Sequence, residues 1–118
     1  MSKILLFIGE NEQFDKEEVV KSIRSINGVE NAKEGDFIGA AFEAEYKVDS
    51  ESYIIRLSDD LETITIDGMD NNCLNFILSL KGMMKDSFQA VDMDYSFHVD
   101  LSIINTIEQF KQEIQKGI

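Results

Sequence analysis

The chain has 118 residues, a formal net charge of −12, one cysteine and no proline. This length and an apolar fraction of 43% are typical of one packed domain, so we expect a single domain over residues 1–118. One cysteine excludes an internal disulfide, and the negative charge argues against direct binding to nucleic acid or to an anionic membrane. The apolar run at residues 4–8 is too short for a signal peptide or a membrane span, so we expect a soluble, cytoplasmic protein.

The first predicted elements are a strand and a helix. Residues 3–8 are nearly all apolar, which favours a buried strand. A helix is expected to begin after Asp15, because its carboxylate can accept hydrogen bonds from the first free amides, and to end at Gly28. Phe14 and Val19 are placed to pack across this helix start.

A three-stranded antiparallel meander is predicted next. Residues 39–48 alternate between apolar positions and polar positions such as Glu43 and Glu45, which indicates a strand with one buried face. Further strands are expected over residues 53–57 and 61–66, and short polar segments join all three.

The last predicted elements are two helices around one strand. A helix over residues 71–85 is expected to be capped by Asp70, the alternation over 91–99 predicts a strand, and Ser102 is expected to cap the final helix. The resulting order is β-α-β-β-β-α-β-α. It predicts an α+β fold, a mostly antiparallel sheet with helices packed on one face, and a ferredoxin-like variant is the first expectation.

Enzyme chemistry finds little support in the sequence. His98 is the only histidine, and Cys73 lies among apolar helix positions, where a buried structural thiol is the ordinary interpretation. No glycine-rich phosphate loop or dinucleotide motif is present. We therefore expect a protein that is not an enzyme and needs no cofactor.

A metal site is a weak alternative. Asp92, Asp94, His98 and Asp100 have the even spacing of one strand face. A straight strand cannot converge such side chains on one ion, so a second element would have to contribute ligands. We expect no metal, and a solvated acidic sheet face explains these residues more simply.

The negative charge falls into groups. Glu43 and Glu45 share one strand face, and Asp92, Asp94 and Asp100 share another, so the two groups merge into one acidic surface if their strands lie close together. A third group surrounds the start of the first helix and consists of Glu10, Glu12, Asp15, Glu17 and Glu18. The helix dipole is a sufficient reason for the last three of these, and solubility is the simplest explanation of any single group.

The size of the total charge favours a basic partner, because self-repulsion on a small domain lowers its stability. The first hypothesis is an immunity or antitoxin protein that blocks a basic, nucleic-acid-acting toxin in a 1:1 complex, or a nucleic-acid mimic. Its predicted contact residues are Glu43, Glu45, Asp92, Asp94, Asp100, Tyr46 and Tyr53.

Two other functional classes are alternatives to this hypothesis. The alternative is a small acidic homodimer that acts as a chaperone or adaptor for a client protein, with Met83 and Met84 on an adaptable apolar surface. A small enzyme or ligand-binding domain ranks last.

Overall fold

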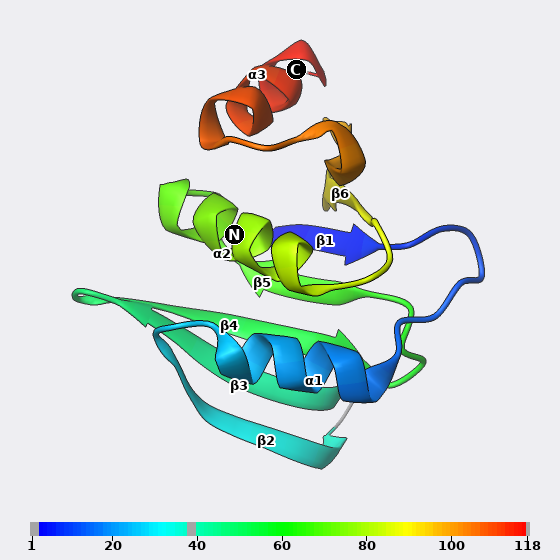
Figure 1. Cartoon of the computed structure of the whole chain (residues 1–118), viewed down its shortest axis with the longest axis vertical. Coiled ribbons are helices and arrows are strands. Elements are labelled where there is room, and N and C mark those ends of the chain that lie inside the picture. The colour runs from blue at the N-terminus through cyan, green and yellow to red at the C-terminus, as the bar shows by residue number, and fades with distance from the viewer. Residues whose placement is uncertain (1–2, 38–39, 118) are drawn as a thin grey trace.

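The computed structural model describes residues 3–37 and 40–117, and it contains seven strands, three α-helices and one short 3-10 helix (Figure 1). In chain order the elements are β1 (Lys3–Phe7), α1 (Lys16–Ser25), β2 (Val29–Phe37), β3 (Ala40–Val48), β4 (Glu51–Ser58), β5 (Ile64–Asp67), α2 (Asn71–Met83), β6 (Gln89–Asp92), β7 (His98–Asp100), η1 (Leu101–Ile103) and α3 (Ile107–Gly117). Gly39, at which the second predicted strand begins, lies outside the described residues.

All seven strands form one sheet in the order β2-β3-β4-β5-β1-β6-β7. Every pair is antiparallel, and β1 lies in the interior of the sheet between β5 and β6. The predicted α+β class with a mostly antiparallel sheet is therefore confirmed. β5 and β6 flank β1, both pair antiparallel with it, and are joined through α2, which is the split β-α-β arrangement that the ferredoxin-like expectation includes.

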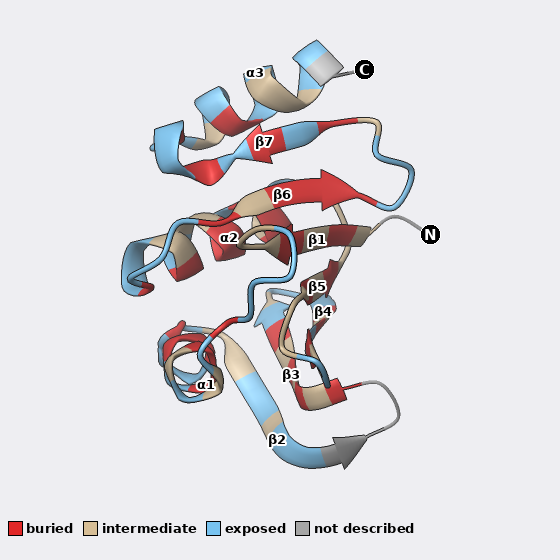
Figure 2. Ribbon diagram, turned by 90° about the vertical axis from the view of Figure 1, so that its right-hand side faces the viewer, coloured by how far each residue is buried: buried red, intermediate tan, exposed pale blue. Residues whose placement is uncertain are grey.

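The two faces of the sheet have different environments. On one face, side chains such as Ile4, Ile55 and Ile66 are fully buried and pack with the buried side chains of α1 and α2 in a single hydrophobic cluster. Figure 2 shows the helices on this side of the sheet and no described element over the opposite side. We call that opposite side the open face. Alternation along β1 places Leu5 and Phe7 there, where both are partly exposed.

The helix starts were predicted well from local sequence. The carboxylate of Asp15 accepts hydrogen bonds from the amides of Glu17 and Glu18, and that of Asp70 accepts one from the Cys73 amide. The last helix exists, but its predicted start at Ser102 was wrong. Asp100 instead caps the short η1, and α3 begins after Thr106, whose hydroxyl accepts a hydrogen bond from the Gln109 amide.

The sequence did not predict β2, and it predicted one long strand where the structure has two short ones. β2 escaped prediction because register shifts at residues 30–33 and 34–37 interrupt its pairing with β3 and its alternation, so the meander has four strands. The predicted strand over 91–99 is instead the β6–β7 hairpin. Val91 lies opposite His98 on the open face, whereas Ala90 and Val99 face the core.

Candidate functional site

Glu43 and Glu45 lie on the open face of β3, as predicted, but neighbouring side chains contact both. Arg56 Nε is 2.6 Å from Glu43 Oε1, which makes an ion pair across β3 and β4. Asn31 Nδ2 and Ser52 Oγ donate hydrogen bonds to Glu45 at 3.1 and 3.2 Å. Arg56 therefore offsets the charge of Glu43, and the two neutral donors satisfy part of the hydrogen-bonding capacity of Glu45.

The predicted group on β6 and β7 is divided by the hairpin. Asp92 is buried, whereas Asp94 and Asp100 are exposed, and the Asp100 carboxylate accepts a hydrogen bond from the Ser102 amide. Three strands, β4, β5 and β1, separate β3 from β6. At a strand spacing of about 4.8 Å, the two predicted acidic groups lie about 19 Å apart and form no common surface.

Tyr46 and Tyr53 are not available as contact residues for a partner. Their exposed fractions are 8% and 5%, because both point from the meander into the core. The Tyr46 ring packs on Phe76 of α2 with ring centroids 5.0 Å apart. The predicted anchoring role of both tyrosines is therefore wrong: the same alternation that turns Glu43 and Glu45 outward turns Tyr46 inward.

Tyr53 instead belongs to a polar contact that joins β4 to the start of α2. Its hydroxyl donates a hydrogen bond to Asp70 Oδ2 at 2.5 Å and accepts one from Asn72 Nδ2 at 3.2 Å. Mainly through the bond to Asp70, the pKa of Tyr53 rises to about 12. Burial acts to raise the pKa of Asp70, but the hydrogen bonds from Tyr53 and the Cys73 amide outweigh it and leave this pKa below the usual 3.8.

Tyr53→Phe is expected to lower the free energy of unfolding at neutral pH by about 1 kcal/mol, because it removes one hydrogen bond to a carboxylate. A depressed folded pKa adds stability above the unfolded value of 3.8 and loses it as the pH falls through the folded pKa. Urea titrations from pH 7 to pH 2 should therefore show the two proteins converging below about pH 4. Tyr46→Phe is the control and should stay near the parent. If the difference in unfolding free energy between Tyr53→Phe and the parent stayed constant down to pH 2, the hydrogen bond to the Asp70 carboxylate would not be the cause.

Cys73 is fully buried at the start of α2, as the sequence predicted for a structural thiol. Burial, with a further contribution from the nearby Asp70 carboxylate, raises the pKa of this thiol to about 12. We expect labelling by an aromatic disulfide reagent at pH 8 to be at least about 100-fold slower in the folded protein than in urea. Fast labelling without denaturant would show that α2 opens readily.

The uncompensated negative charge lies at a different place, where the loop between β1 and α1 meets the turn between β4 and β5. The Phe14 amide donates to the Leu61 carbonyl at 2.7 Å, and Gln13 Nε2 donates to the Asp60 carbonyl at 2.9 Å. Together, residues 10–18 and 58–63 contain eight acidic residues and one lysine. We call this region the acidic end; its acidic residues are Glu10, Glu12, Asp15, Glu17, Glu18, Asp59, Asp60 and Glu62.

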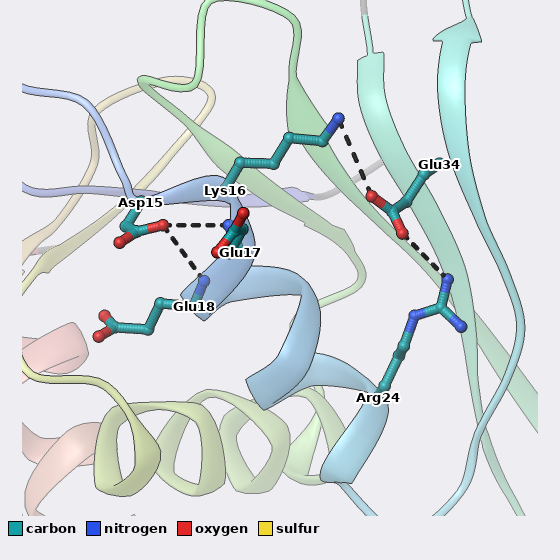
Figure 3. A network of polar contacts seen from close by, with 6 residues as sticks. All are labelled: Asp15, Lys16, Glu17, Glu18, Arg24 and Glu34. Atoms are coloured by element: carbon teal, nitrogen blue, oxygen red, sulfur yellow. Dashed lines mark hydrogen bonds and ion pairs between the residues drawn. The ribbon is translucent and has the colours of Figure 1, made fainter.

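No lysine or arginine of the described residues forms an ion pair with any of these eight carboxylates. The single lysine, Lys16, points toward β2, where Glu34 lies 3.9 Å from it and 3.5 Å from Arg24 (Figure 3). The acidic end therefore keeps a strong negative field.

Hydrogen bonds within the described chain hold only three of the eight carboxylates. Asp15 caps α1, Glu18 accepts a hydrogen bond from the Lys85 amide, and Asp60 accepts hydrogen bonds within its own turn. Within the described chain, the other five carboxylates make no hydrogen bond; they belong to Glu10, Glu12, Glu17, Asp59 and Glu62. The sequence located the half before α1, but nothing local shows that the turn at 59–62 lies beside it.

A groove of about 290 Å³ on the open face adjoins the acidic end. Its apolar part consists of Leu5 and Phe7 from β1, Val91 from β6 and Tyr95 from the β6–β7 turn. The remaining wall is formed by Gly9, Glu10, Asn11, Glu62 and Thr63. The groove thus combines an apolar surface with two carboxylates of the acidic end, a composition typical of a protein-binding surface.

Residues 3–37 and 40–117 contain no group of candidate metal ligands. No three histidine, cysteine or carboxylate side chains in these ranges gather closely enough to hold a metal ion. His98 Nε2 contacts the side-chain oxygen of Gln89, and its ring lies 5.8 Å from that of Phe7. The histidine therefore belongs to the open face rather than to a group of possible ligands.

Comparisons with known proteins add no relative to this description. No family model matches the chain, and neither curated proteins nor solved structures returned a match. Of the helices in the described part of the chain, none combines the length and apolar character needed to cross a membrane.

Proposed function

We propose that this chain is a small acidic binding protein that neutralises a basic protein partner in a 1:1 complex. The most specific form of the proposal is an immunity or antitoxin protein that blocks a nucleic-acid-acting toxin. The observation that carries it is the acidic end, where five carboxylates make no described hydrogen bond or ion pair and two of them, Glu10 and Glu62, line an apolar groove. Neither a catalytic group nor a cofactor is needed for this role.

Electrostatics supports a partner of this class. An enzyme that acts on nucleic acid has a cationic cleft, because its substrate carries one negative charge per phosphate. A concentrated negative field steers such a cleft toward the acidic end and raises the association rate by orders of magnitude at low salt. The same field repels nucleic acid, so the proposed complex contains protein only.

The proposed contact surface differs from the sequence hypothesis. It centres on Glu10, Glu62 and the apolar groove. Of the carboxylates predicted from sequence, Asp94 precedes the groove residue Tyr95 and is exposed, so we keep it at the margin of this surface. Asp100 is also exposed, whereas Glu43 and Glu45 have partners within the chain.

The test begins by capturing partners from the native host on the immobilised protein at low salt and releasing them at high salt. Released basic proteins are identified by mass spectrometry, purified and titrated back at several salt concentrations. We expect 1:1 binding that weakens with salt, together with inhibition of the partner's nuclease or other nucleic-acid activity. Failure of every purified basic candidate to bind at low salt would overturn the proposal. A stable homodimer in sedimentation runs would instead favour the chaperone alternative.

A further inference from the structure

Tyr95 is an exposed aromatic residue held in a costly backbone conformation. Its side chain is 76% exposed, and its φ of +54° lies in the left-handed region, which costs a residue with a Cβ about 1 kcal/mol. Burial of the ring does not offset this strain. An exposed, strained aromatic residue in a groove indicates a contact with something outside the chain.

The turn that carries Tyr95 is held firmly by Asp92. The Asp92 carbonyl accepts a hydrogen bond from the Tyr95 amide at 3.2 Å, and its carboxylate accepts bonds from both the amide and the hydroxyl of Ser96. Although burial acts to raise the pKa of Asp92, these bonds outweigh it and leave the pKa below its ordinary range. Asp92 is therefore a positioning residue, and it fixes Tyr95 at the groove before any partner arrives.

The chemistry of the groove defines what it accepts. The described residues that line it include the carboxylates of Glu10 and Glu62 but no lysine, arginine or histidine. Leu5, Phe7 and Val91 offer apolar surface to an aliphatic chain. The face of a tyrosine ring attracts a cation, most often a guanidinium.

We propose that this groove binds an arginine side chain of the basic partner. The aliphatic part of the arginine packs on Leu5, Phe7 and Val91, and its guanidinium meets the carboxylates of Glu10 or Glu62 and the Tyr95 ring. Arginine fits better than lysine because its planar guanidinium both pairs with carboxylates and stacks on aromatic faces. This inference rests on the proposed function and adds the side chain that the groove recognises.

The first test maps a defined probe on the full-length protein labelled with ¹⁵N. The probe is the blocked tripeptide acetyl-Gly-Arg-Gly-amide, followed by amide chemical shifts. Its neutral control replaces arginine with citrulline, which has nearly the same shape, and a lysine tripeptide is the third arm. We expect saturable shifts centred on residues 5–11, 62–63 and 91–95 with arginine, weaker ones with lysine and none with citrulline.

Matched variants separate local contacts from net charge. Glu10→Gln/Glu62→Gln should weaken binding of the arginine probe about tenfold, since both carboxylates that can meet the guanidinium lose their charge. Glu51→Gln/Glu108→Gln changes the net charge equally at exposed residues outside the groove and should weaken it less than about twofold. Tyr95→Ala should weaken binding about two- to fivefold, and Tyr95→Phe should restore it because the ring face is kept.

Failure of arginine binding in the groove and failure of the proposed function give different results. Shifts spread over all acidic residues, equal shifts with citrulline, or equal losses in the two double variants would each overturn arginine binding in the groove. The proposed function is judged separately by the purified partner. Binding of that partner, unchanged by Tyr95→Ala and by Glu10→Gln/Glu62→Gln, would overturn the groove assignment and leave the function standing.

Discussion

Glu12→Lys/Glu17→Lys is expected to slow association with the purified basic partner by about tenfold at low ionic strength. Both glutamates are exposed parts of the acidic end, and neither side chain makes a described hydrogen bond or ion pair. Their replacement therefore changes the field that the partner meets and leaves the packing of α1 intact. Stopped-flow association rates at several salt concentrations measure the effect.

The control for this experiment makes the same change of charge elsewhere. Glu51→Lys/Glu108→Lys alters the net charge equally at exposed residues of β4 and α3. We expect it to slow association less than about threefold, because sites beyond one Debye length are largely screened. Equal slowing by the two double variants would mean that total charge, rather than the acidic end, guides the partner. The two rates should converge as salt is added.

Phe76→Ala is expected to lower the free energy of unfolding by about 3–5 kcal/mol. Phe76 is fully buried in α2, and its ring packs against Tyr46 of β3 at a centroid distance of 5.0 Å. The truncation leaves a cavity between helix and sheet. Because small domains have a total stability of about 5–15 kcal/mol, the loss is large enough to populate unfolded protein at moderate temperature.

Urea denaturation with matched m-values measures this loss. Met83→Ala in the same helix is the control, because the Met83 side chain is 45% exposed and its truncation should change stability by no more than about 0.5 kcal/mol. A loss below about 1 kcal/mol for Phe76→Ala would show that α2 packs loosely on the sheet.

Local signals explain which parts of the fold the sequence predicted. Asp15 and Asp70 each stand directly before an amphipathic or apolar run, and a short carboxylate there has one dominant use, which is to accept the first helix amides. The uninterrupted alternation of β3 likewise identified its buried and exposed positions. In these places, residues adjacent in the chain decide the structure.

The predictions were wrong where irregular backbone or contacts between distant parts of the chain determine the structure. The bulges of β2 remove its alternation, and the turn at Asp92 and Ser96 sits inside a pattern that continues to alternate through it. Strand order depends on pairing across the whole chain, so the sequence could not show that three strands separate Glu43 from Asp94. The acidic end likewise depends on contacts between residues 10–18 and 58–63, so the sequence could identify only the half that precedes α1.

The interior position of β1 has a consequence for biogenesis. Its neighbours β5 and β6 begin at Ile64 and Gln89, so both are synthesised long after β1 leaves the ribosome. Until then, the apolar residues 4–8 have no strand on either side, and such a segment is prone to aggregate. Folding must wait for most of the chain, and the carboxylates that follow β1 keep the nascent segment apart from its copies by charge repulsion in the meantime.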